Sequence, residues 1–119
     1  MNRERLNHLI TILENVAPAR FDLNEWKCGT TACAIGHACL DPELNRQGLY
    51  LERVAGDWGA WTPSYGDSRS WGAVQAFFDL NFSNTLHLFA HDSYHDEGEA
   101  PVRPQEVIAR IQQFMKDNP

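Results

Sequence analysis

The chain has 119 residues, enough for one domain of ordinary size and too few for a second hydrophobic core. Hydrophobic residues make up 43% and charged residues 22%, values typical of a folded globular protein and not of a disordered one. Sixteen acidic against ten basic residues give a formal net charge of −6, which argues against direct nucleic-acid binding, because phosphate neutralisation requires a basic face. We therefore expect a single globular domain over residues 1–119.

The N-terminal residues and the cysteines indicate a cellular compartment. The first residues lead into an amphipathic segment, and no apolar run approaches the roughly 18 residues that a membrane span needs. The three cysteines are an odd number and lie close together, which fits a reducing compartment better than a disulfide framework. The sequence predicts a cytoplasmic protein without membrane association.

Two helices are expected in the first third of the chain. Apolar residues recur at helical spacing over residues 3–16, which predicts an amphipathic first helix. A second helix is expected over residues 31–40, with the hydroxyl of Thr30 or Thr31 as its cap. The Asp41-Pro42 pair should stop it, since a residue before proline avoids the helical region.

The middle of the chain changes character. Residues of β type alternate in part and are punctuated by Gly and Pro, so we expect a short, irregular β-hairpin over about residues 48–65. Three further helices are expected: one capped by Ser70, one that begins at Ser83 and one that Pro104 opens. Residues 92–101 are expected to form an acidic loop. The sequence thus predicts a mainly helical α+β fold, with four to five helices around one core.

All three cysteines lie in a twelve-residue segment of mostly small side chains, which allows three interpretations. Cys33 and His37 are four residues apart and share one face of a helix, so that with Cys28 they are candidate ligands of a Zn²⁺ cofactor. A cysteine just before a helix start can also be held as a thiolate, which makes Cys28 a candidate nucleophile with a histidine base. Standard zinc knuckles with C-x2-C spacing are missing, and no second signature of a thiol enzyme accompanies the segment.

The third interpretation is structural, and we favour it. Free cysteines behave as small buried hydrophobes, and a helix of small residues packs with its backbone close to its neighbours. Cys33 and Gly36 are then buried, and His37 is satisfied by a backbone carbonyl. On this interpretation the segment contains no catalytic residue and holds no metal or cofactor.

Two groups of residues are candidates for contact with a partner. Aromatic side chains dominate interface energetics, and three of them lie in the Gly-rich middle region. Acidic side chains without basic neighbours follow between residues 92 and 99 and favour a basic partner surface. The candidate partner-binding residues are Trp58, Trp61, Tyr65, Asp92, Asp96, Glu97 and Glu99.

Four motifs carry a resemblance to known sequences. They are Asp22-Leu23-Asn24-x-Trp26 followed by Cys28-Gly29-Thr30-x-Ala32-Cys33-x-x-Gly36-x-Ala38, then Phe77-Phe78-x-Leu80, then Leu88-Phe89, and last Pro104-x-x-Val107-Ile108-x-Arg110-Ile111. In these motifs the chain resembles a group of small proteins of bacterial and phage genomes. The resemblance implies a shared fold and an intracellular setting, often on a mobile element, and it implies no reaction.

These observations lead to two hypotheses for the function. The first is a small acidic binding protein, borne by a phage or mobile element, that acts non-enzymatically by occupying a host protein or ribonucleoprotein complex. Inhibition of a bacterial immune complex such as a CRISPR effector is its specific case, because an acidic protein can cover a basic nucleic-acid channel. The second hypothesis is a metal-binding protein or a thiol enzyme centred on Cys28, Cys33 and His37.

Overall fold

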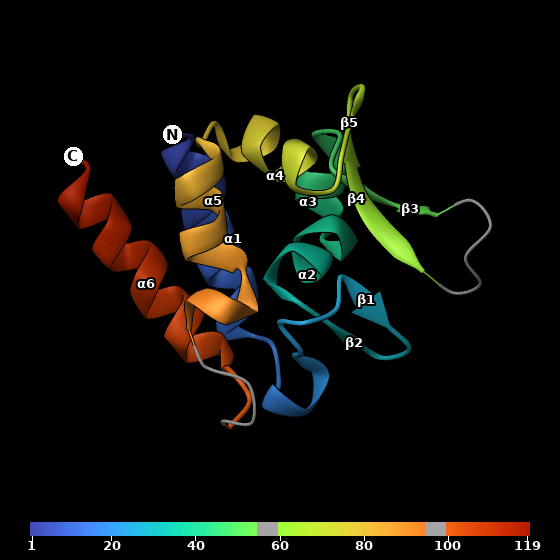
Figure 1. Ribbon diagram of the computed structural model, residues 1–119, viewed down its shortest axis with the longest axis horizontal. Helices are drawn as coiled ribbons and strands as arrows, with labels where there is room; N and C mark the ends of the chain where they lie inside the picture. The colour runs from blue at the N-terminus through green and yellow to red at the C-terminus, as the bar shows by residue number, and fades with distance from the viewer. Residues whose placement is uncertain (55–59, 95–99) are drawn as a thin grey trace.

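The computed structural model describes residues 1–54, 60–94 and 100–119, and this part of the chain forms six α-helices and five short strands (Figure 1). The mainly helical α+β class is therefore confirmed. The helices are α1 (Arg3–Glu14), α2 (Ala34–Leu40), α3 (Pro42–Arg46), α4 (Trp71–Phe78), α5 (Phe82–Phe89) and α6 (Pro104–Asp117). The strands are β1 (Lys27–Cys28), β2 (Thr31–Ala32), β3 (Tyr50–Arg53), β4 (Trp61–Tyr65) and β5 (Ser68–Arg69), and 3₁₀ turns η1 and η2 cover Pro18–Arg20 and His91–Ser93.

Helix α1 provides much of the hydrophobic core. It packs against α2, α4 and α6, so the first and last helices of the fold lie side by side (Figure 1). Its apolar stripe, Leu6, Leu9 and Leu13, is fully buried, as the helical spacing predicts. None of the helices in the described ranges is long and apolar enough to cross a membrane.

The strands form two small antiparallel sheets. β3, β4 and β5 pair in that order, and β1 pairs with β2. The expected hairpin corresponds to β3 and β4, with Glu52 opposite Thr62, while β5 is an additional strand. Pro63 occupies the central strand, where its carbonyl oxygen accepts a hydrogen bond from the Ser70 amide at 2.9 Å. The parts of the expected hairpin and acidic loop at residues 55–59 and 95–99 lie outside the described residues.

The prediction for the start of the second helix was wrong by three residues. Thr31 and Ala32 extend as β2 and pair with β1, so that α2 begins only at Ala34. The cap is the Cys33 Sγ, which accepts a hydrogen bond from the Gly36 amide at 3.3 Å. The Thr31 hydroxyl instead donates to the carbonyl oxygen of Cys28 at 2.8 Å.

Asp41-Pro42 ends α2 as predicted, but it also starts α3, which the sequence interpretation missed. The Asp41 Oδ2 accepts hydrogen bonds from the amides of Glu43 and Leu44, both at 3.1 Å, and Pro42 takes the first helical position. A carboxylate cap and a proline at this position are favourable at a helix N-terminus.

The expected cap of α4 and the expected start of α5 were also wrong. Ser70 makes no side-chain capping bond to α4 and has a positive φ of 58°. Helix α5 begins at Phe82, one residue earlier than expected, because the Asn81 side chain accepts from the Asn84 amide at 2.7 Å. Helix α6 opens at Pro104 as predicted, and the Glu106 side chain accepts from the Arg103 amide at 2.8 Å.

Candidate functional site

The cysteine segment packs as the structural interpretation predicts. Cys33 and Gly36 are buried, and the Gly36 backbone lies directly against the loop before β1. A Cβ atom at Gly36 would stand 1.8 Å from the carbonyl oxygen of Trp26. Trp26 in turn contacts Trp71 of α4 edge to face, with ring centroids 4.7 Å apart. Gly36 is therefore required for the close approach of α2 to this loop.

The thiols differ in their surroundings. Desolvation by burial raises the pKa of Cys33 to about 12 and outweighs the opposing effect of its backbone hydrogen bonds. Burial also raises the pKa of Cys39. A thiol with such a pKa stays protonated at neutral pH, whereas the thiolate is the nucleophile and the metal ligand. Cys28 is exposed in the β1–β2 hairpin and does not share the burial of Cys33 and Cys39.

The candidate zinc ligands have separate partners. Cys33 caps α2, and the His37 Nε2 lies 2.8 Å from the carbonyl oxygen of Arg20, as the structural interpretation expected. The His37 ring also stacks on Phe21, with a centroid separation of 6.3 Å. Within the described ranges, no three His, Cys, Asp or Glu side chains are grouped so that they could hold a metal ion. The geometry gives Cys33 and His37 structural roles.

The aromatic partner candidates lie around the three-stranded sheet. Trp61 is half-buried, with the Arg53 Cζ 4.6 Å and the Lys27 Nζ 5.5 Å from the centroid of its ring. Tyr65 is half-buried against the core and meets Phe77 edge to face, with centroids 5.1 Å apart. Trp58 lies outside the described residues. Two cationic side chains therefore lie near the Trp61 ring.

Among the acidic candidates, Asp92 is exposed in η2, and its Oδ1 lies 3.6 Å from the His91 Nδ1. A hollow of about 680 Å³ beside Asp92 is bordered by Trp71 and Leu86. Asp96, Glu97 and Glu99 lie outside the described residues. The η2 turn follows α5 on the side of α6, whereas β4 lies across the molecule (Figure 1). The structure therefore does not bring Asp92 and Trp61 into one patch.

Hydrogen bonds from α6 hold the η2 turn in place. The Arg110 Nη1 donates to the carbonyl oxygens of His87 at 2.9 Å and Ser93 at 2.8 Å. The Arg110 Cζ also lies 3.6 Å from the centroid of the Tyr94 ring, a distance typical of a cation–π contact. These contacts with α6 fix the position of the segment that carries Asp92.

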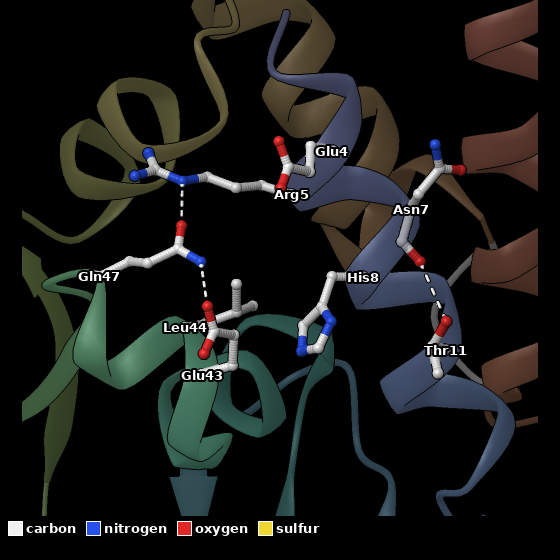
Figure 2. Close-up of a pocket in the computed structure, with 8 residues that line it drawn as sticks. All are labelled: Glu4, Arg5, Asn7, His8, Thr11, Glu43, Leu44 and Gln47. Carbon is white, nitrogen blue, oxygen red and sulfur yellow. Dashed lines mark hydrogen bonds between the residues drawn. The ribbon is translucent and has the colours of Figure 1, made fainter.

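A further hollow, of about 340 Å³, lies between α1 and α3, and sequence reasoning missed it (Figure 2). Along one wall Arg5 donates to the Gln47 side chain at 2.8 Å, and Gln47 donates to Glu43 at 3.0 Å. His8 projects from α1 toward α3, and its Nε2 lies 2.9 Å from the Asp41 Oδ2. The only signal in the sequence is the i, i+4 spacing of Glu4 and His8 beside the apolar stripe of α1.

Three of the arginines have backbone carbonyl oxygens as hydrogen-bond partners. Arg3, Arg5 and Arg110 donate to the carbonyl oxygens of Met115, Phe77 and His87. The Arg5 guanidinium also lies over the Phe77 ring, with its Cζ 4.0 Å from the centroid. Carboxylates are exposed on several elements, namely at Glu4, Glu14, Glu25, Asp67, Asp92 and Asp117. With sixteen acidic and ten basic residues in the chain, negative charge predominates.

Comparisons with known protein families, with curated proteins and with solved structures found no match to this chain. The resemblance to small bacterial and phage proteins stays a prediction.

Proposed function

We propose that this protein is a non-enzymatic binding protein that occupies a basic surface of a host macromolecule. The observation that best supports this proposal is the arrangement of charge. Three arginines donate hydrogen bonds to the protein's own backbone, whereas carboxylates are exposed on several elements. An acidic surface of this kind steers association with a basic partner and disfavours acidic ones. The anchoring of η2 by Arg110 supports the proposal, because it presents Asp92 in a fixed position.

The specific partner that we propose is a CRISPR effector complex of a bacterial host, with the protein acting in the cytoplasm on behalf of a phage or mobile element. Such a complex holds nucleic acid in a positively charged channel, so an acidic protein that covers the channel competes with DNA. The formal net charge of −6 supports this choice. The motif Cys28-Gly29-Thr30-x-Ala32-Cys33 and its resemblance to phage proteins support the setting.

The test measures DNA binding by a purified CRISPR effector complex in the presence of increasing amounts of this protein. We expect this protein to reduce the amount of bound DNA relative to the effector alone at the same salt concentration. This relative reduction should become smaller as salt is raised from about 0.1 M to about 1 M, because the Debye length falls from about 10 Å to about 3 Å. We also expect Asp92→Lys to slow association with the effector, since exposed charges steer encounter.

The matched control is Asp67→Lys, which makes the same change of charge in the exposed β4–β5 turn. Equal slowing by the two substitutions would show that only net charge matters and that Asp92 is not part of the binding surface. Unchanged DNA binding at every salt concentration, with the effector shown to be active, would exclude this partner.

A further inference from the structure

The hollow between α1 and α3 has a neighbouring hollow along the same helix. The second hollow, of about 400 Å³, lies between α1 and the junction of α2 with α3. His8 and Thr11 border both hollows. We call the two together the α1 groove. It runs along α1 from Glu4 to the end of the helix at Glu14, about 15 Å at 1.5 Å per residue, and reaches Val16 just beyond it.

The two ends of the α1 groove differ chemically. The first end is lined by the carboxylates of Glu4 and Glu43 and by Arg5, whose guanidinium donates to Gln47 and to the Phe77 carbonyl oxygen, both at 2.8 Å. Glu43 forms a salt bridge with Arg46, whereas Glu4 is exposed and forms no ion pair with another described residue. The Glu4 carboxylate therefore favours a cationic group at this end.

The other end of the α1 groove is apolar. Ile12 of α1 and Val16, which follows the helix, are half-buried there, and Leu40 stands at the border with 53% of its surface exposed. Leu40 is one of few large apolar side chains so exposed in the described ranges, and a partner that covers it removes apolar area from water, which favours binding. The His8–Asp41 pair separates this end from the acidic one.

We propose that the α1 groove receives a helical segment of a partner protein, with a basic side chain against Glu4 and Glu43 and an apolar side chain against Leu40. Helices bind in grooves of this kind through side chains spaced along one face. Glu4 and Ile12 are eight residues apart on α1, so an aligned partner helix carries its basic residue at i and its apolar residue at i+7 or i+8. The inference rests on the proposed binding function and names the segment that the partner would present.

The probes are three synthetic helical peptides. The first has Arg at i and Leu at i+7 and i+8, the second has Glu in place of the Arg, and the third has Ser in place of both Leu residues. Peptide affinity is measured by fluorescence anisotropy, and the contact surface by amide chemical shifts in NMR spectra. We expect the Arg–Leu peptide to bind about tenfold more tightly than either other peptide and to shift the amides of His8, Thr11 and Leu40.

Two substitutions and their controls assign the peptide to the α1 groove. Glu4→Arg should reverse the preference between the Arg and Glu peptides, while Glu14→Arg, an equal change on α1 outside the groove, should keep it. Leu40→Ser should weaken the Arg–Leu peptide about tenfold, while Phe82→Ser, at a residue that is also 53% exposed, should leave its affinity unchanged. All four positions are exposed, and circular dichroism confirms that each variant is folded.

Three results would overturn the inference: no binding up to millimolar peptide, amide shifts confined to residues outside the α1 groove, or equal effects of each substitution and its control. These results are independent of the effector assay. If the protein inhibits the effector but does not bind the peptides, the proposed function stands and the proposed role of the α1 groove is excluded. If the protein binds the peptides but does not inhibit the effector, the role of the α1 groove stands and the effector is excluded as the partner.

Discussion

Gly36 fixes the distance between α2 and the loop that precedes β1. The small residues of the cysteine segment predicted a close approach of this kind, and the buried position of Gly36 confirms it. The partner of that approach, the carbonyl oxygen of Trp26, was not predictable, because residues ten apart in the sequence give no periodic signal across a hairpin.

We expect Gly36→Ala to lower the free energy of unfolding by about 3 kcal/mol, since the added Cβ meets backbone at 1.8 Å and forces the loop to move. The measurement is urea denaturation followed by circular dichroism. Gly72→Ala in α4 is the control, because its Cβ would have its nearest neighbour at 4.0 Å. Alanine there should stabilise the protein by about 0.5–1 kcal/mol. Equal stability of the Gly36→Ala variant and the wild type would show that the contact is not tight.

The buried thiols predict a loss of stability at alkaline pH. The pKa of Cys33 is raised from 9.0 to about 12 in the folded protein, so between these values the native state binds the proton and the unfolded chain releases it. Stability is fully present below pH 9 and falls above it, by about 1.4 kcal/mol per pH unit for this thiol. Cys39, whose pKa is also raised, adds to the slope.

Urea denaturation at pH 8, 9 and 10 under reducing conditions measures this slope. The Cys33 thiol of the unfolded chain is half ionised at pH 9, so Cys33→Ser should make the slope between pH 9 and pH 10 shallower by about 1 kcal/mol. Serine does not titrate in this range and can still cap α2. Cys28→Ser, the same substitution at the exposed cysteine, is the matched control. A slope that is identical in the wild type and in Cys33→Ser would mean that this thiol ionises freely in the folded protein.

At the scale of the elements, long amphipathic helices were predictable and short elements were not. Helices α1 and α6 follow from apolar residues at helical spacing, and their observed bounds differ little from the expected ones. Helix α3 has five residues, too few to show a periodicity, and its start at Asp41-Pro42 was mistaken for a stop alone. The β1–β2 pair was missed because each strand has two residues and its pairing depends on tertiary contacts.

The Arg110 clamp between α6 and η2 should contribute measurably to stability. We expect Arg110→Met, which keeps an unbranched apolar stem, to cost about 1–2 kcal/mol, because the carbonyl oxygens of His87 and Ser93 lose a charged donor. Lys116→Met near the end of the same helix is the control and should change stability by less than about 0.5 kcal/mol, because Lys116 is exposed. Thermal unfolding of the wild type and of both variants measures these changes in stability. Equal losses of stability in both variants would show that the loss of a positive charge, and not of the hydrogen bonds, causes the effect.

At the scale of the molecule, the candidate binding residues divide between two sides. The sequence placed Trp61 and Asp92 in one list, but β4 and η2 lie apart in the fold (Figure 1). Sequence reasoning also missed the α1 groove, because its walls come from α1 and from residues 37–47, which only the folded chain brings together. Residue types were readable from the sequence, whereas their grouping required the tertiary structure.

If Trp61 is an anchor in the interface with the effector, Trp61→Ala should speed dissociation about 30-fold, which corresponds to about 2 kcal/mol. Association should change little, because the substitution alters no charge. Stopped-flow or surface-plasmon-resonance kinetics separate the two rates. Trp61 also contacts Lys27 and Arg53, so Trp61→Phe, which keeps an aromatic ring between them, is the folded control. An unchanged dissociation rate for Trp61→Ala would place the anchor elsewhere.

The contact of α1 with α6 has a consequence for the growing chain during synthesis. Helix α1 ends at Glu14, and the partner that covers part of its surface is complete only at Asp117. At a translation rate of 5–20 residues per second, α1 waits about 5–20 s for this partner. During that time part of the apolar stripe around Leu6 and Leu9 stays accessible to chaperones or to other nascent chains. A ribosome that stalls before residue 104 would therefore release a chain that is prone to aggregate.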